Sequence, residues 1–358
     1  VFANATTYTC LLFLNKQEIK DFKFVKVNDL LSWRQDEPQK EGNVLADKVT
    51  DADWNFVVGP GAKLFERLRE MPVKLGDVAD RMAQGIRTSA NEVYVLELIS
   101  DDDQVIQARS NRLDRIVTLE RDLLALFLQG REIKSYRILH SGKIVIIPYR
   151  VQDGYARLIP EHELKQDYPY TYAYLRENKQ YLENREGGRM RGSNWYAYVY
   201  PKNIEIMATP KLLIPDIADR AAFAIDLPGK YALTSGYGII LKESYIKFPM
   251  YILGLLNSKV LDFYLKQVST TIRGGFFRYF KQFIEQLPIR AINFSDPTDK
   301  TRHDRMVELV EQMLDLNKRL AEAKEPQSKT VLQRQIETTD RQIDQLVYEL
   351  YELTEEEI

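Results

Sequence analysis

The sequence contains few of the residues that hold metal ions or form disulfides. One cysteine, Cys10, and three histidines, His140, His162 and His303, are spread over 358 residues. A single cysteine cannot form an internal disulfide, and histidines this far apart lack the spacing of a zinc site. We therefore predict a chain without a metal site, in a reducing, cytoplasmic compartment.

Long apolar runs and phosphate-binding loops are also missing from the sequence. No apolar stretch is long enough to span a bilayer and no signal peptide is visible, so we expect no membrane partner. Neither a Walker A loop nor a GxGxxG motif between a strand and a helix is present. These absences argue against the common nucleotide-binding enzymes.

One weak carboxylate pattern leaves an enzymatic alternative open. Asp216, Asp226 and Lys230 faintly resemble the metal-binding set of a nuclease, but Leu-Pro-Gly-Lys stands where a Glu/Asp-x-Lys triplet is expected. A β-turn after a strand explains the same residues without any chemistry. A divergent Mg²⁺-dependent DNA nuclease is therefore kept as the alternative function.

Charge is distributed unevenly, although the net charge is only −2. The windows 131–150, 185–202 and 266–290 together hold 14 lysines and arginines against 3 acidic residues, whereas 296–358 is acidic. Phosphates respond to clustered cations rather than to the total charge. The pattern favours a nucleic-acid partner for the middle of the chain.

Hydrophobic periodicity predicts two strands at the start of the chain, over 5–14 and 19–27. They lack a sheet of their own, and the chain opens on Val1 rather than methionine. We therefore interpret residues 1–27 as the edge of a sheet whose other strands lie in a longer protein. Residues 28–70 are polar and predict a linker with short helices, one of them over 64–71.

The pattern over 71–295 predicts one α+β domain, because short strands and helices alternate between glycines and prolines. We predict strands over 91–99, 143–147, 211–214 and 239–242, and helices over 119–128, 169–181 and 250–267. Residues 296–358 predict a helical hairpin with one apolar face, broken near 325–328. Such a face needs a partner surface, which indicates dimerisation or docking.

Five segments, in this order along the chain, carry a family resemblance. They are Met82–Val95, Leu128–Tyr136, Arg191–Trp195 with Pro210–Ile217, Leu253–Lys259 and Ile272–Ile289. Together they resemble the TaqI-like C-terminal specificity domain of type IIG restriction–modification enzymes and, more distantly, the specificity subunits of type I systems. Within the first segment, Ser89 stands where the family usually has glycine.

The resemblance implies a module that reads double-stranded DNA and presents an adenine to an upstream methyltransferase domain of the same polypeptide, which flips the base. That domain would bind S-adenosylmethionine, and an accompanying endonuclease would use Mg²⁺. The Asn-Pro-Pro-Tyr loop and the glycine-rich cofactor loop of such enzymes are missing here. We therefore predict no catalytic residue and no cofactor in this chain.

The same resemblance interprets the two ends of the chain. The first strands are similar to the last strands of the methyltransferase sheet, and the hairpin is similar to the paired helices that follow these specificity domains. Self-association through the hairpin is a further expectation. A third interpretation, a protein-assembly module with incidental basic windows, also stays open.

Candidate DNA-binding residues lie on polar, glycine-flanked loops, where arginine can read guanine and glutamine or asparagine can read adenine. Lys134 and Arg137 suit phosphates, which position a protein without reading sequence. The full set of candidates is Gln84, Arg87, Thr88, Asn91, Lys134, Arg137, Arg189, Arg191, Tyr237, Thr271, Arg273 and Arg278. For each, a solvated turn or surface is the simpler alternative.

Overall fold

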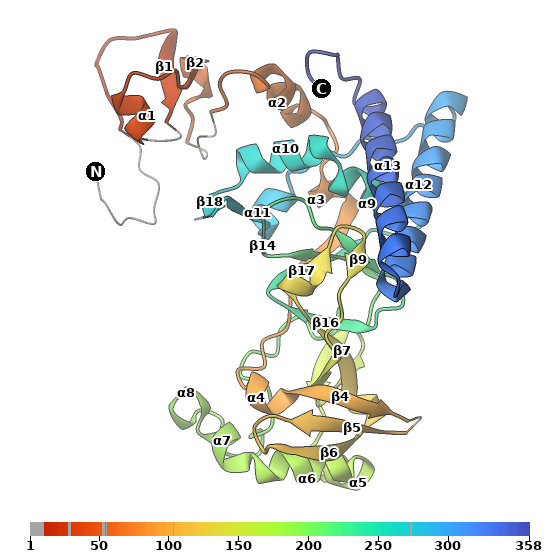
Figure 1. The fold of residues 1–358 in the computed structure, drawn as a ribbon. Coiled ribbons are helices and arrows are strands. Elements are labelled where there is room, and N and C mark those ends of the chain that lie inside the picture. Colours follow the sequence, from red (N-terminus) through yellow and green to blue (C-terminus); the bar gives the residue numbers. More distant parts are fainter. Residues whose placement is uncertain (1–10, 28–29, 52–53, 55, 103, 273) are drawn as a thin grey trace.

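The computed structural model describes residues 11–27, 30–51, 54, 56–102, 104–272 and 274–358. Figure 1 shows an elongated molecule with a small N-terminal unit at one end and a lobe of strands and helices at the other. Two long helices run along one side of the body between them. No helix in the described part of the chain is both long and apolar enough to cross a membrane.

The N-terminal unit is an antiparallel pair formed by β1 (Asp21–Lys26) and β2 (Lys40–Leu45), with α1 (Leu30–Arg34) between them. The ring of Phe56 packs edge-on against Phe22 and Phe24, with centroids 5.3 and 5.6 Å apart. The predicted strand over 19–27 is confirmed, but its partner lies in the predicted linker. Strand β2 was not predicted, because Val44 is its one buried residue and the sequence therefore shows no apolar alternation.

The other predicted N-terminal strand, over 5–14, lies partly outside the described residues. Residues 11–14 have no regular secondary structure, and their side chains are exposed. The expected pairing of two consecutive strands is therefore not formed by the described residues, because 19–27 pairs with a later segment.

The lobe drawn lowest in Figure 1 is built on a six-stranded sheet of order β16-β7-β10-β4-β5-β6. Only the β16–β7 contact is parallel. The strands are β4 (Val95–Asp101), β5 (Val105–Ser110), β6 (Arg115–Glu120), β7 (Leu124–Gln129), β10 (Lys143–Ile146) and β16 (Tyr231–Thr234). Helices α5 (Glu161–Asp167), α6 (Pro169–Glu177), α7 (Lys179–Glu183) and α8 (Arg185–Gly188) lie beneath.

The helix predicted over 119–128 is wrong. These residues end β6, form the short 3-10 turn Arg121–Leu123 and become β7, which pairs on both sides with β16 and β10. A strand with neighbours on both edges and apolar contacts on both faces shows no alternation, so its run of leucines resembles a buried helix. The predicted strand over 143–147 and helix over 169–181 are confirmed by β10 and by α6 with α7.

The body contains a four-stranded sheet of order β15-β13-β17-β3. Its strands are β3 (Ala79–Gln84), β13 (Lys211–Pro215), β15 (Ala224–Asp226) and β17 (Gly236–Leu241), which confirms the strands predicted over 211–214 and 239–242. The strand predicted over 91–99 is only partly right, because α4 (Asn91–Tyr94) forms one helical turn before β4 begins.

Smaller elements complete the lobe and the body. They are α2 (Ala62–Arg69), α3 (Leu75–Val78), β8 (Ile133–Lys134), β9 (Arg137–Ile138), β11 (Tyr149–Gln152), β12 (Tyr155–Leu158), β14 (Ile217–Ala218), β18 (Thr271–Ile272), β19 (Phe276–Arg278) and α11 (Lys281–Ile284). Of these, β11 and β12 pack against the lobe core. The helix predicted over 250–267 is two helices, α9 (Pro249–Asn257) and α10 (Lys259–Val268). The break comes at Ser258, whose hydroxyl caps α10 by accepting from the Leu261 amide.

The predicted C-terminal hairpin consists of α12 (Pro297–Glu322) and α13 (Pro326–Leu350). Its apolar face packs onto α9 and joins the core of the body. At Gly254 of α9, a Cβ would lie 2.5 Å from the sulfur of Met306 and 2.9 Å from Val310. The missing side chain therefore lets the two helices approach closely, and the chain itself covers the hairpin's apolar face.

Because hairpin and body share one core, Ile343→Val should destabilise both together. Ile343 is 1% exposed, and removing one buried methylene should cost about 1 kcal/mol. Hydrogen exchange should show the same loss of protection for amides in α13 and β13. Ile358→Val, at an exposed position, is the control. Loss of protection confined to α13 would show that the hairpin unfolds on its own.

Candidate nucleic-acid interface

The loop that follows β3 is held by a glycine with no space for a side chain. A Cβ at Gly85 would lie 2.1 Å from the carbonyl oxygen of Leu233. The amides of Gly85 and Ile86 donate to the carbonyls of Gly236 and Leu233, at 3.0 and 2.9 Å. The backbone of this loop is thus fixed against the turn between β16 and β17, and Arg87 is left exposed.

A second glycine, Gly130 of the segment Leu128–Tyr136, packs against the same turn between β16 and β17. A Cβ at Gly130 would lie 2.2 Å from the carbonyl oxygen of Ser235. Ser235 itself has φ of 55°, in the left-handed region. Two chain segments that are far apart in the sequence therefore pack against residues 233–236. This packing fixes the position of the next residue, Tyr237, which pairs with Gln84.

Gln84, Arg87 and Tyr237 come together at this point. A guanidinium nitrogen of Arg87 donates to Oε1 of Gln84 at 3.0 Å, and Tyr237 pairs with Gln84 across the sheet. Burial raises the pKa of the Tyr237 hydroxyl, against the opposing effects of the Lys281 backbone and the Arg87 charge. These side chains offer both donors and acceptors, as base edges in a major groove require.

Thr88 and Asn91 have a structural role in the same loop. Thr88 is 1% exposed; its hydroxyl donates to Oδ1 of Asn91 at 2.6 Å and accepts from the Ala90 amide at 3.1 Å. The side chain of Thr88 is therefore buried and hydrogen-bonded within the loop, and its contact with DNA stays a prediction. Ser89 has φ of 55°, the left-handed conformation that glycine adopts most easily, where the family usually has glycine.

The segment around β18 and β19 extends this surface. Arg278 pairs with Ile217 of β14 and lies over the ring of Phe280, 5.4 Å from its centroid. Phe280 lies 6.4 Å from Tyr237, so one aromatic ring links the two candidates. Thr271 is half-buried in β18. Arg273 lies outside the described residues.

The basic loop 185–195 is linked to Arg87 through Tyr200. Arg87 and Tyr200 form an antiparallel bridge, and the Tyr200 hydroxyl donates to Oε2 of Glu186 at 3.3 Å. Arg189 and Arg191 are exposed, whereas Trp195 is 0% exposed and packs beneath the loop, as predicted. In Figure 1, α8 and β18 lie on the same side of the molecule, away from α12 and α13.

Lys134 and Arg137 lie elsewhere. They pair across the β8–β9 turn and line a cleft of about 780 Å³ whose other wall includes Glu337 and Asp340 of α13. Within the described residues, neither cation has a carboxylate within ion-pair distance. The structure therefore separates them from Arg87 and faces them toward an acidic helix, and phosphate contact by these two residues stays a prediction.

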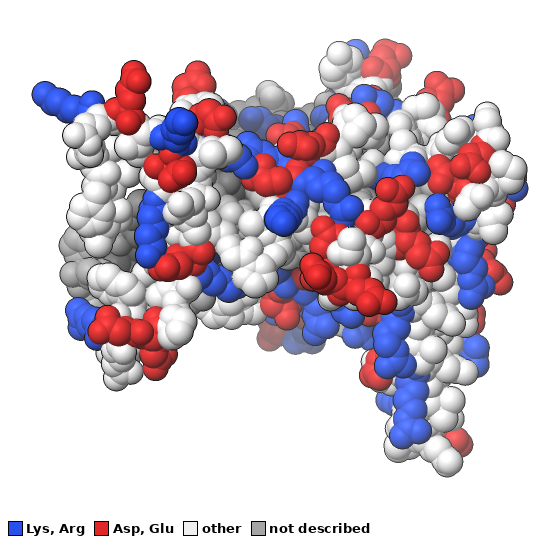
Figure 2. Space-filling model, turned by 90° about the horizontal axis from the view of Figure 1, so that it is seen from above, with Lys and Arg blue, Asp and Glu red and all other residues white. Residues whose placement is uncertain are grey.

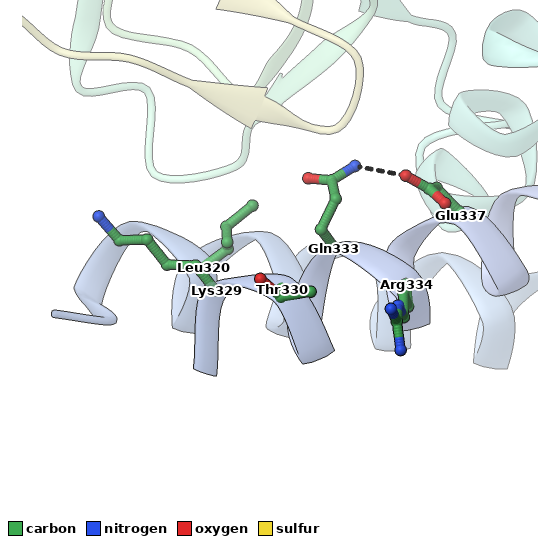
Figure 3. Close-up of a pocket in the computed structure, with 6 residues that line it drawn as sticks. All are labelled: Leu320, Lys329, Thr330, Gln333, Arg334 and Glu337. Atoms are coloured by element: carbon green, nitrogen blue, oxygen red, sulfur yellow. Dashed lines mark hydrogen bonds between the residues drawn. The ribbon is translucent and has the colours of Figure 1, made fainter. Parts of the chain in front are cut away.

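A second pocket lies on the hairpin beside this cleft and shares Gln333 and Glu337 with it. Figure 3 shows Gln333 and Glu337 projecting to the same side of α13, where the Gln333 amide donates to Glu337 at 3.3 Å. Arg334 points away from them. The side chains that line this pocket include one carboxylate, Glu337, and one apolar residue, Leu320, and we assign it no ligand.

The nuclease alternative gains no support from the carboxylates. Asp226 is 1% exposed and accepts from Nζ of the buried Lys211 at 2.7 Å, as well as from the amides of Lys230 and Tyr231. A carboxylate committed in this way is not available to a catalytic metal. Across the described residues, no group of three His, Cys, Asp or Glu side chains is placed to hold a metal ion.

Positive and negative side chains are mixed on the face of the molecule that Figure 2 shows. Figure 2, seen from above, shows lysines and arginines interspersed with acidic side chains over this end of the molecule. Basic residues without acidic neighbours must therefore be sought in particular loops. Arg87, Arg189, Arg191 and Arg278 are such a set, because they are exposed and make no ion pair with a carboxylate of the described residues.

Residues 125–289 match the family model described as a TaqI-like C-terminal specificity domain. This part of the chain is similar to TaqI-like specificity domains. The match covers the Gly130 contact, the 185–195 loop, Tyr237 and the β18–β19 segment. The loop 84–91 lies before it, although its backbone is fixed to the specificity domain by Gly85.

Three curated relatives extend the similarity beyond the specificity domain. The chain is 26% identical to the type II restriction enzyme and methyltransferase RM.Eco57I of Escherichia coli, over 99% of this chain and 37% of the relative. It is 26% identical to the type II methyltransferase M.BstVI of Geobacillus stearothermophilus, over 76% and 39%. It is 28% identical to M.BanIII of Aneurinibacillus aneurinilyticus, over 70% and 39%. The chain thus spans less than two-fifths of their length.

Sequence reasoning missed one residue that the structure places at the centre of these loops. Arg185 is 7% exposed, and its guanidinium donates to four backbone carbonyls. Nothing in the local sequence distinguishes it from Arg189 and Arg191, which are exposed. Only the packing of the loop reveals which arginine is internal.

Proposed function

We propose that this chain recognises a short sequence in double-stranded DNA. The observation that carries the proposal is the contiguous set of Gln84, Arg87, Tyr237 and Arg278, drawn from separate segments of the chain and brought to one surface. Arginine pairs with guanine and glutamine with adenine through two hydrogen bonds in the major groove. Arg189 and Arg191 would add phosphate contacts beside them.

The relatives are type II methyltransferases, one of them also a restriction enzyme. In the proposed complete enzyme, this chain would position DNA so that an upstream domain methylates an adenine with S-adenosylmethionine. An endonuclease with Mg²⁺ would be present only in some enzymes of this kind. A cytoplasmic location follows from the same proposal. Self-association through the hairpin gains no support, because α9 already covers the hairpin's apolar face.

Arg87→Ala tests the proposal directly. If Arg87 reads a base, the variant should bind the preferred sequence about 1–3 kcal/mol more weakly and should hardly change binding to other DNA. The measurement is a pair of dissociation constants, for selected and scrambled duplexes, each at two salt concentrations.

A surface arginine away from the loops provides the matched control. Arg334 is exposed on α13, and Arg334→Ala should alter neither constant. Equal weakening on both duplexes by Arg87→Ala, with a smaller salt dependence, would assign Arg87 to a phosphate instead. Wild-type protein that binds all duplexes equally would contradict sequence recognition itself.

A further inference from the structure

Arg185 joins three chain segments beneath the proposed DNA-binding surface. Its Nε donates to the Leu182 carbonyl at 2.8 Å, and one Nη donates to the Thr88 carbonyl at 3.2 Å. The other Nη donates to the carbonyls of Trp195 and Ala197, at 2.9 and 2.8 Å. The segments joined are the end of α7, the loop 84–91 and the chain that follows the basic loop.

The surroundings of this guanidinium show that its position is fixed. It lies 5.8 Å from the centre of the Tyr94 ring, whose hydroxyl donates to the Tyr196 carbonyl at 2.7 Å. No carboxylate of the described residues lies within ion-pair distance of Arg185. A buried cation without a carboxylate is costly unless its donors are satisfied, and here four carbonyls satisfy them.

The bonded segments are those that present the candidate side chains. Thr88 directly follows Arg87, while Glu186, the neighbour of Arg185, accepts from Tyr200, which bridges Arg87. Arg189 and Arg191 lie on the loop between Arg185 and Trp195. The distance between Arg87 and these two arginines therefore depends on the bonds of one internal guanidinium.

We propose that Arg185 is a positioning residue that sets the register of the base-reading loop relative to the basic loop. The inference rests on the proposed function, since it concerns how two loops meet one DNA duplex. Direct readout tolerates little displacement, because paired hydrogen bonds to a base edge need distances near 3 Å and fixed angles. Phosphate contacts by flexible arginines tolerate more.

The chemistry of arginine is needed at this position. A guanidinium has five donors in a rigid plane and can bond three segments at once, whereas a lysine ammonium carries its three donors on one atom. Arg185→Lys keeps the charge and most of the length but can serve fewer of the carbonyls. This variant therefore distinguishes the effect of the hydrogen bonds that join the loops from the effect of the positive charge at position 185.

The experiment is a selection from a random-sequence duplex library with the full 358-residue chain. Wild-type protein should enrich a short motif. Arg185→Lys should bind scrambled DNA within about twofold of wild type, but its preference for the motif should fall at least tenfold. A folded Arg185→Lys variant with the wild-type preference would overturn the inference and leave the proposed function intact. No enrichment by wild type would overturn both.

Tyr174→Phe is the matched control for a general loss of stability. Tyr174 is 2% exposed, and its hydroxyl donates to the Val93 carbonyl at 2.7 Å in the same lobe, without touching either loop. This variant should lower the melting temperature and keep the preference for the motif. An equal loss of preference in Tyr174→Phe would mean that any loosening of the lobe suffices, and would overturn the role of Arg185.

A wild-type measurement keeps the inference testable if Arg185→Lys does not fold. The amides of Ala90 and Ala197 are both hydrogen-bonded, to Thr88 Oγ1 and the Asn194 carbonyl. If Arg185 ties their segments together, the two amides should show hydrogen-exchange protection within about threefold of each other. Protection that differs by more than tenfold would show independent opening of the two segments and overturn the inference.

Discussion

Lys211→Met should lower the free energy of unfolding by about 3–5 kcal/mol. The side chains of Lys211 and Asp226 are both 0% exposed and lie 2.7 Å apart. Burial lowers the pKa of Lys211, while its hydrogen bond to Asp226 acts in the opposite direction. Methionine fills the volume but leaves a buried carboxylate without its cation, so the loss should be visible in chemical denaturation.

Lys300→Met is the control for this variant, because Lys300 and Asp304 are also 2.7 Å apart but more than half exposed. It should leave the stability nearly unchanged, since solvent screens an exposed pair. If Asp226 instead served a nuclease, Lys211→Met would impair Mg²⁺-dependent DNA cleavage by a protein that remained folded. A stable Lys211→Met variant would contradict the structural role of the pair.

Gly85→Ala should cost about 3 kcal/mol of stability and abolish the preference for a DNA sequence. Overpacking of a core costs up to about this amount, and here the added carbon would meet the backbone carbonyl of Leu233 at 2.1 Å. The loop and the β16–β17 turn would have to separate, which displaces Arg87 and Tyr237 together. Binding to selected and scrambled duplexes should become equal.

Gly154→Ala separates crowding from backbone strain. Gly154 has φ of 77° and no atom within 4 Å of an added Cβ. The variant should therefore lose only about 1 kcal/mol of stability, the cost of placing alanine in the left-handed backbone conformation. Its DNA preference should stay that of wild type. Retention of the preference in Gly85→Ala would mean that the loop 84–91 does not read bases.

The sequence predicted the α+β class, the hairpin and several loops because each depends on local patterns. The hairpin shows the period of an amphipathic helix, and β13 is a short apolar run between turn residues. It failed for 119–128, where burial on both faces of β7 removes the alternation that distinguishes a strand from a helix. It also failed for β2, where a mostly exposed strand has too few apolar residues to show a period.

The sequence could predict which loops carry the candidate site residues, but it could not predict how these loops lie relative to one another. Glycines at 85 and 130 are visible in the sequence, yet only the structure shows both packed against residues 233–236. The burial of Thr88 and the separation of Lys134 and Arg137 from Arg87 follow from long-range packing. Arg185 could not be identified at all, because its partners are backbone carbonyls that any sequence provides.

The two cores of this chain differ in when they can form during synthesis. The core of the lobe draws on buried residues from Ala83 to Leu233, whereas that of the body needs residues from Leu64 to Tyr351. At a ribosome speed of about 5–20 residues per second, the body core waits roughly 6–25 s after the lobe is complete. The lobe can therefore fold first and offer a finished surface, on which α9 and finally the hairpin assemble. A nascent chain that contains α9 but lacks the hairpin exposes the apolar face of α9, and that face is where a chaperone would be expected to bind.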